Sequence, residues 1–321
     1  MAPMSDQSPL RLGVSSCLLG EEVRFDGGHK RHAFLVQTLG RFVEWVPVCP
    51  EVEIGLPVPR PSLRLVGEPE DPSLIVQKTG EDLTAIMQIW AEGRIAALEQ
   101  AGIDGYVLKK DSPSCGMERV RVYGPGSSPS RRGSGIYAAS LMGAMPLLPV
   151  EEEGRLNDPV LRENFIERVF AYRSWREFRA GDPGPGDLVG FHTRHKLALM
   201  AHNPQRYREL GRLVSGAGRA DMGGLLDEYG AGFMEVLRYK ATRRKHANVL
   251  YHLAGYLKRA LDADDKEELG SVIESYRTGL IPLVVPVTLL RHHFRRHPDE
   301  WVAEQTYVNP YPAELMLRNH V

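Results

Sequence analysis

The sequence predicts an α/β domain with an open, mostly parallel sheet, followed by a second domain that is all helical. Three observations lead to this fold class. Residues 11–150 alternate short apolar runs with glycine and proline, which is typical of buried parallel strands. Helical stretches lie between these runs, as in other chains that alternate strands and helices. Beyond residue 153 amphipathic segments take over from the short apolar runs.

The domain boundary is expected after residue 154, so that residues 1–154 form the α/β domain and residues 155–321 the helical domain. In the first domain the strands are expected within the runs LRLGVSSCLLG, FVEWVPVCPE, IDGYVLKKDSPSCG and AMPLLPV. Its expected helices span 31–43, 83–100 and 136–145. The second domain has expected helices at 158–179, 188–201, 204–214, 222–260, 266–278 and 286–296.

Composition indicates an ordinary globular protein of the cytoplasm. The chain has 321 residues, of which 42% are hydrophobic and 25% charged. No stretch approaches the roughly 20 continuous apolar residues of a membrane helix, and the first residues lack the basic and apolar regions of a secretory signal. Three cysteines, an odd number, argue against a closed disulfide framework and for a reducing compartment. Nothing in the sequence indicates an oligomeric state.

The three cysteines each follow a predicted strand. Cys17 closes the run LGVSSC, Cys49 closes WVPVC, and Cys115 lies just past YVLKKDSPSCG. Ligands of open parallel sheets bind beyond the carboxyl ends of the strands, so we expect these three residues to converge on one edge of the sheet.

Four interpretations of the cysteines are open on the residues alone. They can be unrelated core residues, because free cysteine is often buried. They can hold zinc, although structural zinc normally takes four ligands. One of them can be a nucleophile. Lastly, they can hold an iron–sulfur cluster in which one iron lacks a protein ligand and is open to a soft sulfur atom. The Gly, Pro, Ser and acidic neighbours of each sulfur argue against simple core packing.

The segments GVSSCLLGEEVRFDGGHKR, VPVCPEVEIGLPVPRPSLRL and GYVLKKDSPSCG resemble the TudS family of thiouracil desulfidases. The later segments FHTRHKLALMAHNPQRYRELGRLV, KATRRKHANVLYHLAGYLKRAL and QTYVNPYPAELMLRN resemble the YbgA-type helical domain. The two in this order resemble bacterial fusions of the RudS type, which remove sulfur from 4-thiouridine in tRNA. The resemblance implies a 4Fe–4S cluster held by Cys17, Cys49 and Cys115, a thiolated pyrimidine as substrate, and water replacing its sulfur to give uridine and sulfide.

Replacing C=S by C=O requires a group that deprotonates the attacking water. Glu51, two residues after Cys49, is the expected base, because a carboxylate near a dry cluster is expected to have a raised pKa. Glu53 is the alternative base. Ser112, three residues before Cys115, is expected to donate a hydrogen bond to substrate or to relay a proton, although serines in such turns also act as turn formers.

The helical half is expected to contact tRNA. It carries 25 Lys and Arg against 21 Asp and Glu, whereas residues 1–154 carry 15 against 20. Lysine and arginine contacts to phosphates supply most of the affinity for nucleic acid, although a charged helix face can also merely be solvated. The expected contacts are Arg194, Lys196, Arg206, Arg208, Lys240, Arg243, Arg244 and Lys245.

The leading functional hypothesis is therefore an iron–sulfur tRNA 4-thiouridine desulfidase. The second is the same chemistry on free thiouracil or a thiolated nucleoside, with the helical half serving assembly. The third is a protein that binds metal or nucleic acid without catalysis.

Overall fold

The computed structural model describes residues 9–124, 128–219 and 221–321. Residues 1–8, which bear on the expected absence of a secretory signal, lie outside these ranges. The described chain divides into two compact units, with the division between Asn157 and Asp158.

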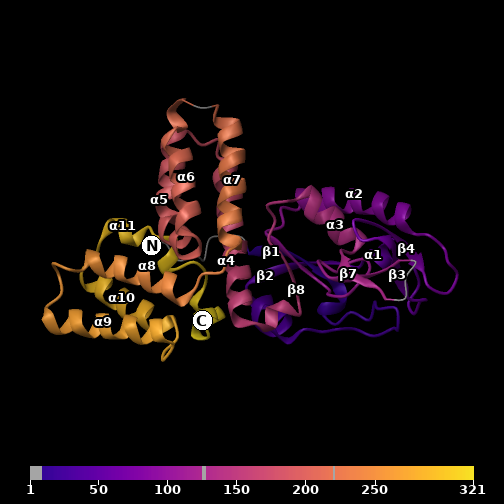
Figure 1. Ribbon diagram of the computed structural model, residues 1–321, viewed down its shortest axis with the longest axis horizontal. Helices are drawn as coiled ribbons and strands as arrows, with labels where there is room; N and C mark the ends of the chain where they lie inside the picture. Colours follow the sequence, from indigo (N-terminus) through magenta and orange to yellow (C-terminus); the bar gives the residue numbers. More distant parts are fainter. Residues whose placement is uncertain (1–8, 125–127, 220) are drawn as a thin grey trace. The chain divides into compact units, whose positions relative to one another are not determined.

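The first unit is built on a parallel four-stranded sheet. Its strands are β1 (Leu10–Ser15), β2 (Val43–Val48), β5 (Gly105–Leu108) and β8 (Val150–Glu152), in the order β2-β1-β5-β8. The expected runs contain β1, β2 and β5, whereas the run AMPLLPV meets β8 only at its last residue, Val150. The prediction of a parallel sheet is confirmed. The helices α2 (Thr84–Gln100) and α3 (Ile136–Ala144) lie side by side along one face of this sheet (Figure 1).

The sheet is packed tightly where β1 passes β5. Gly13 faces the ring of Tyr106, and a Cβ atom at position 13 would lie only 2.2 Å from that ring. Tyr106 itself is fully buried, as are Leu12 and Val14 on β1. The short strands are thus fixed by burial of apolar side chains, which also fixes where each strand ends.

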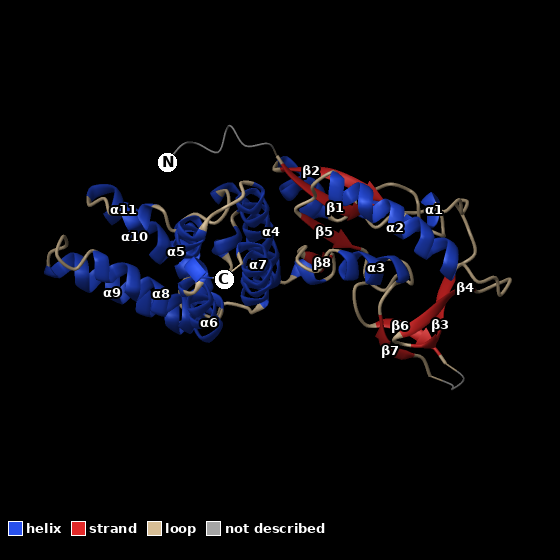
Figure 2. Cartoon of the chain, turned by 90° about the horizontal axis from the view of Figure 1, so that it is seen from above, coloured by secondary structure: helices blue, strands red, loops and turns tan. Residues whose placement is uncertain are grey.

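A second four-stranded sheet was not expected from the sequence. It contains β3 (Leu63–Glu68), β4 (Asp71–Val76), β6 (Val120–Tyr123) and β7 (Ser130–Gly133), in the order β4-β3-β6-β7. The pairs β3–β4 and β6–β7 are antiparallel, and β3–β6 is parallel. Figure 2 shows this sheet set apart from the strands β1, β2 and β5. The first unit therefore has two sheets where the sequence predicted one.

The prediction of a regular helix over residues 31–43 is wrong. The chain there forms a π-helical turn (Phe34–Thr38) followed by a 3₁₀ turn (Leu39–Arg41) and enters β2 at once. Gly40 and the β-branched residues Val36 and Thr38 lower the helix propensity of this segment.

The second unit is all helical in its described part, as predicted. Its helices are α4 (Pro159–Ala180), α5 (Pro185–His202), α6 (Pro204–Ser215), α7 (Met222–Arg238), α8 (Arg243–Tyr256), α9 (Ala263–Thr278), α10 (Val284–Arg296) and α11 (Glu300–Ala303). Figure 1 shows α5, α6 and α7 running side by side, and α8, α9 and α10 as a second group. No helix in the described ranges has both the length and the apolar character that crossing a membrane requires.

The expected single helix over residues 222–260 is two helices in the structure. Tyr239 is extended, with φ −70° and ψ 131°, and ends α7. The side chain of Thr242 then accepts a hydrogen bond from the backbone N–H of Lys245 and begins α8. Threonine is a favoured first residue before a helix because its oxygen satisfies an otherwise unpaired N–H.

Candidate active site

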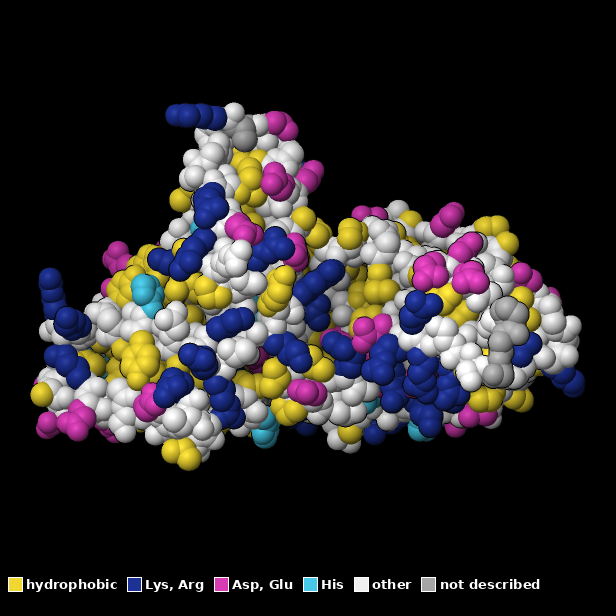
Figure 3. All heavy atoms as spheres, in the orientation of Figure 1, with side chains coloured by type: hydrophobic (Ala, Val, Ile, Leu, Met, Phe, Trp, Pro, Cys, Tyr) yellow, Lys and Arg dark blue, Asp and Glu magenta, His cyan; other side chains and the backbone are white. Residues whose placement is uncertain are grey.

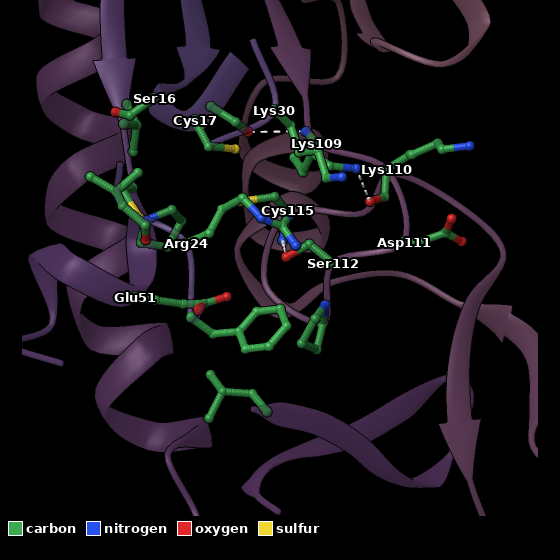
Figure 4. Close-up of a pocket in the computed structure, with 18 of the residues that line it drawn as sticks. Ser16, Cys17, Arg24, Lys30, Glu51, Lys109, Lys110, Asp111, Ser112 and Cys115 are labelled. Carbon is green, nitrogen blue, oxygen red and sulfur yellow. Dashed lines mark hydrogen bonds between the residues drawn. The ribbon is translucent and has the colours of Figure 1, made fainter. Parts of the chain in front are cut away.

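A pocket of about 340 Å³ lies at the carboxyl ends of the parallel strands. Its lining includes Cys17, Cys49 and Cys115, together with Glu51 and Ser112. The structure therefore brings the three cysteines together with both of the expected catalytic side chains. In Figure 4 the side chains of Cys17, Cys115 and Glu51 face one shared space.

Each cysteine is placed by the end of a different strand. Cys17 lies in a 3₁₀ turn, Ser16–Leu18, directly after β1. Cys49 follows β2 and precedes a short helix, α1 (Pro50–Glu53). Cys115 lies in the loop after β5, where its backbone N–H donates to Ser112 Oγ at 3.1 Å. Because β2, β1 and β5 are neighbours in the sheet, the three loops open on the same edge.

Burial raises the pKa of all three thiols. The pKa of Cys17 rises to about 11, although the nearby ammonium of Lys109 opposes the rise. Burial also raises the pKa of Cys49, and it raises that of Cys115 well above the usual value. Without a bound cation these sulfurs are therefore protonated thiols at neutral pH. Metal ligation requires thiolates, so loading of this pocket releases protons.

The positions of the three thiols bear on whether they can bind a single metal ion or an iron–sulfur cluster. Within the described residues, no group of three or more His, Cys, Asp or Glu side chains is gathered so as to hold a metal ion. A single zinc ion needs all its thiolates at about 2.3 Å. The three sulfurs instead surround a pocket that has room for a larger body. Three cysteines that line a pocket of about 340 Å³ fit an iron–sulfur cluster better than one ion.

Glu51 is held in place by two neighbours. Arg60 Nε donates to Glu51 Oε2 at 2.8 Å, and the Arg60 side chain is only 3% exposed. Ser114 Oγ donates to Glu51 Oε1 at 3.0 Å. Arg60 is fixed in turn by donating from Nη2 to the carbonyl of Val23 at 2.9 Å. The carboxylate thus has a set orientation beside the cysteines.

Glu53 has a different position. Its Oε1 accepts a hydrogen bond from the backbone N–H of Cys49 at 3.1 Å, and its Oε2 lies 3.3 Å from Arg94 Nε. Glu53 is not among the residues that line the pocket. Its role in the structure is to hold the turn that carries Cys49, so Glu51 is the better placed of the two candidate bases.

Ser112 shapes the loop that carries Cys115. Its Oγ accepts from the backbone N–H groups of Ser114 and Cys115, at 3.2 and 3.1 Å. Because the oxygen acts as acceptor in both contacts, the hydroxyl hydrogen is still available to donate into the pocket.

Sequence reasoning missed Arg60 and the contact of Ser114 with Glu51. Arg60 lies in the segment GLPVPRPS, where nothing in its neighbours marks it as a buried ion-pair partner. The basic side chains around the pocket are Arg24, Lys30, Arg60, Lys109 and Lys110. Figure 3 shows lysine and arginine side chains gathered over part of this unit.

The eight cations expected to contact tRNA all lie in the helical unit, and half of them have structural contacts. Arg206 pairs with Glu209 and Glu235. Lys245 Nζ donates to the carbonyl of His202 at 2.6 Å. Lys196 lies over the ring of Trp301, and Arg243 over that of Tyr276. The other four are exposed and form no ion pair with a described residue: Arg194, Arg208, Lys240 and Arg244.

Fold and pocket together define a class: an α/β protein that carries a cysteine-lined pocket at its strand ends and is joined to an all-helical unit. The comparisons with known proteins identify the particular family. The chain belongs to the 2-thiouracil desulfurase family, whose model matches residues 12–153. Residues 196–312 match a second family, described as a protein of unknown function (DUF1722).

Two curated relatives each correspond to about half of the chain. The uncharacterized protein YbgA of Escherichia coli (strain K12) is 30% identical over 158 residues, which are 49% of this chain and 94% of YbgA. The uncharacterized protein YbbK of Bacillus subtilis (strain 168) is 33% identical over 150 residues, which are 45% of this chain and 97% of YbbK. The solved structure of the 4Fe–4S-dependent thiouracil desulfidase TudS shares 33% identity, covering 46% of this chain and 94% of that one, with a TM-score of 0.39.

Proposed function

We propose that this protein is an iron–sulfur-dependent desulfidase that converts the C=S group of 4-thiouridine in tRNA to C=O and releases sulfide. The observation that carries the proposal is the pocket at the strand ends, where three cysteines from three loops share one space with a fixed carboxylate. Membership of the 2-thiouracil desulfurase family supports the reaction type.

In this proposal Cys17, Cys49 and Cys115 hold a 4Fe–4S cluster. Such a cluster, when bound by three protein thiolates, leaves one iron without a protein ligand, and this iron supplies a Lewis acid with affinity for soft sulfur. Lys109 and Arg24 are the cations that act on the charge of Cys17, and they line the same pocket.

The remaining chemistry belongs to side chains of the pocket. The overall reaction is a hydrolysis: water adds its oxygen to carbon, the C–S bond breaks, and sulfur leaves as sulfide, without a net change of oxidation state. Glu51 takes the proton of the attacking water, and Arg60 and Ser114 hold the carboxylate in the required orientation. Ser112 donates its hydroxyl hydrogen to the substrate ring or to the departing sulfur.

The test of the cofactor and the base uses protein that has been purified and reconstituted without oxygen. We expect brown protein with iron and sulfide in equal amounts, and loss of both colour and turnover when any one of the three cysteines is replaced by alanine. Glu51→Gln should keep the iron and sulfide content but lose turnover by a factor of about 10²–10⁴, the usual contribution of a general base. A colourless, zinc-loaded protein after reconstitution, or full activity of Glu51→Gln, would contradict the proposal.

The tRNA part of the proposal assigns the helical unit to the nucleic acid. Four of the expected cations have no ion-pair partner among described residues and are free for phosphates: Arg194, Arg208, Lys240 and Arg244. Replacing all four by Gln should weaken tRNA binding. It should also reduce the slope of a plot of the logarithm of the binding constant against the logarithm of the salt concentration, by at most about 0.7–0.9 for each replaced residue.

The control replaces four other exposed cations of the same unit with Gln, so that the net charge changes equally. These are Lys258, Arg259, Lys266 and Arg296. Equal loss of tRNA affinity in both variants would show a general charge effect and would remove the assigned surface.

The second candidate function is desulfuration of free thiouracil. The family description favours it, since it names 2-thiouracil. Turnover of 2-thiouracil and of tRNA that contains 4-thiouridine, measured on the same reconstituted protein, separates the two. A higher kcat/KM on free thiouracil than on tRNA would show that free thiouracil is the substrate. The proposed reaction type would stay the same.

A further inference from the structure

An ion pair joins the two residues that directly follow neighbouring strands of the parallel sheet. The strand β5 ends at Leu108 and β8 ends at Glu152, and these two residues are partners in the sheet. Lys109 and Glu153 come next along the chain, and Lys109 Nζ lies 2.7 Å from Glu153 Oε1. Their side chains are 13% and 10% exposed, so the pair is largely shielded from water. Lys109 also lines the cysteine pocket.

The backbone on both sides of this ion pair is fixed by hydrogen bonds. The backbone N–H of Lys109 donates to Ser15 Oγ at 3.0 Å, and the backbone N–H of Lys110 donates to Glu153 Oε2 at 2.7 Å. The backbone N–H of Glu153 donates in turn to the carbonyl of Leu108 at 3.2 Å. The carboxylate of Glu153 therefore orients both the ammonium of Lys109 and the peptide group that follows it.

The ammonium of Lys109 has a donor to spare. An ammonium carries three N–H donors. The contacts of Lys109 with Glu153 and with the carbonyl of Lys110, at 2.7 Å each, use at most two of them, and the side chain forms no other hydrogen bond with a described residue. In Figure 4 Lys109 lies between Cys17 and Lys110. The ammonium also opposes the rise in the pKa of Cys17, so its charge acts at that sulfur.

The other cations that line the pocket are less suited to meet a ligand as a shielded charge. Arg60 is already committed to its carboxylate partner, and Arg24 pairs with an aspartate of its own loop. Lys30 and Lys110 are exposed, and water weakens the field of an exposed charge. Among the described lining residues, Lys109 is thus the cation that is both shielded and equipped with a spare donor.

The proposed hydrolysis places negative charge on sulfur. As the C–S bond breaks, its electron pair goes to the sulfur. One proton of the attacking water goes to Glu51 and the other to the sulfur, so that HS⁻ leaves and the carboxylate is protonated. A fixed donor that meets the sulfur as this charge develops lowers the barrier, because it needs no reorganisation at the moment of reaction. A shielded ammonium is such a donor.

We infer that Lys109 is a further catalytic residue, which donates a hydrogen bond to the departing sulfur, and that Glu153 is the positioning residue that orients it. This inference rests on the proposed desulfidase function and deepens it by assigning the stabilisation of the leaving group. Lys109 keeps its own proton throughout and contributes a charge-assisted hydrogen bond. The hydroxyl of Ser112 is then left to donate to the substrate ring.

The test uses full-length protein reconstituted without oxygen. Lys109→Met removes the charge and the donors but keeps a side chain of similar length. Lys109→Met combined with Glu153→Gln removes both charges, so that no carboxylate is left shielded without its partner. The amide oxygen that Glu153→Gln introduces still accepts from the N–H of Lys110. The control is Lys78→Met, at an exposed lysine of the same unit that does not line the cysteine pocket.

The first measurement is the affinity for hydrosulfide, which does not depend on turnover. Sodium sulfide is titrated into the reconstituted protein, and the visible absorption is followed. Both variants at Lys109 should bind hydrosulfide about 10–100-fold more weakly than wild type, as expected for the loss of one hydrogen bond between charged groups, and should keep the iron and sulfide content. Loss of iron from both variants would show that Lys109 acts on the cysteines instead, and would overturn the inference.

The second measurement compares two leaving groups, in short RNA strands that carry one 4-thiouridine or one 4-selenouridine. Hydroselenide is a weaker base than hydrosulfide, so its departure needs less help from a donor. Lys109→Met should lower kcat by about 10–100-fold on the sulfur substrate, with KM little changed, and by a smaller factor on the selenium substrate. A merely structural role would lower kcat equally on both substrates, and that result would overturn the inference.

The two measurements separate this inference from the proposed function. If no thiolated substrate turns over but the affinity for hydrosulfide depends on Lys109 as expected, the proposed function fails and the contact of Lys109 with sulfur stands. If both variants at Lys109 match Lys78→Met in hydrosulfide affinity and in kcat on each substrate, the inference is overturned.

Discussion

Arg60 and Glu51 form an ion pair at the wall of the cysteine pocket, with Arg60 Nη2 2.7 Å from Glu51 Oε2 and Arg60 Nε also bonded to that oxygen. The side chains are 3% and 14% exposed, so the pair is largely shielded from water. Arg60 comes from a loop nine residues further along the chain and also donates to the carbonyls of Pro57 and Val23. The arginine therefore ties the expected base to the loop of Val23, which also lines the pocket.

Replacing Arg60 should damage both stability and turnover. Arg60→Gln leaves the Glu51 carboxylate in a shielded place without its counter-charge, and breaking a buried pair in this way costs about 3–5 kcal/mol. We expect a value at the lower end, because Glu51 keeps some exposure. Thermal unfolding and kcat/KM measure the two effects.

The double variant Arg60→Gln with Glu51→Gln is the matched control. It removes both charges, so it should regain part of the lost stability while staying inactive. Arg60→Lys should be intermediate in turnover, since lysine keeps the charge but not the fork of donors. Wild-type stability and turnover in Arg60→Gln would show that the pair has no role in the site.

Ser112 holds the loop of Cys115, because its Oγ accepts hydrogen bonds from two backbone N–H groups of that loop. Ser112→Ala removes both acceptor contacts and should cost about 1 kcal/mol, as the loss of a comparable cap does. The loop then holds Cys115 less firmly, so iron content after reconstitution should fall. Ser112→Thr keeps the hydroxyl and should restore the iron content. Equal iron content in wild type and Ser112→Ala would limit Ser112 to a role toward substrate.

The meeting of the three cysteines at one edge of the parallel sheet could be predicted from the sequence, because it follows from the topology of the sheet. Each cysteine follows an apolar run, and parallel strands end on one edge, so Cys17, Cys49 and Cys115 had to meet if the runs were neighbours. The partners of Glu51 could not be predicted in this way. Arg60 reaches it from an irregular loop rich in proline, and no periodic pattern relates the two positions.

The second sheet, formed by β3, β4, β6 and β7, escaped prediction for a different reason. Its strands β3 and β6 carry charged side chains between their apolar ones, as at Arg64 and Arg121, so they lack the continuous apolar runs of the buried parallel strands. In the helical unit the amphipathic pattern predicted the helices, but it did not predict which acidic side chains contact the lysines and arginines. Arg206 is bound by Glu235 from another helix, which only the folded arrangement reveals.

Gly135 lies where a side chain would push against the loop of Cys115. A Cβ atom at this position would come within 2.5 Å of the backbone of Ser114 and 2.8 Å of the backbone nitrogen of Cys115. Gly135→Ala should therefore displace the loop, cost about 1–3 kcal/mol as other overpacked sites do, and lower the iron content. Thermal unfolding and metal analysis of the reconstituted protein measure these effects.

Gly143→Ala is the control for this substitution. Gly143 lies in α3, and nothing stands within 4 Å of a Cβ atom placed there. Alanine is the better helix former, so this variant should be as stable as wild type or more stable by up to about 1 kcal/mol. If Gly135→Ala matched it in stability and iron content, the close approach at Gly135 would not constrain the site.

In the helical unit, Glu167 and His202 form a fully shielded pair, with His202 Nε2 3.1 Å from Glu167 Oε2. The other ring nitrogen of His202 faces the carbonyl of Tyr239. Both neighbours are acceptors, so both ring nitrogens must donate and the imidazole is charged. Burial disfavours the charged form of both side chains, but the attraction between the two opposite charges outweighs this effect. The pKa of His202 is therefore raised, and the pKa of Glu167 is lowered to about 2.

These shifts define a pH window for stability. The raised pKa of His202 gives stability that is fully present below its usual 6.5 and is lost as the pH rises through the folded-state value. The lowered pKa of Glu167 gives stability that is present above its usual 4.5 and is lost as the pH falls toward 2. The pair should therefore stabilise the fold most between about pH 4.5 and 6.5.

Glu167→Gln should lower the free energy of unfolding by about 3–5 kcal/mol within that window, because it leaves His202 buried without its counter-charge. The difference from wild type should shrink on either side of the window. Denaturant unfolding followed by far-ultraviolet circular dichroism at several pH values measures it. Arg277→Gln, which breaks an exposed pair with Glu274, is the control and should show no such dependence between pH 5 and 8. If Glu167→Gln lowered the free energy of unfolding by the same amount from pH 3 to 8, the pair would not be ionised in the folded protein.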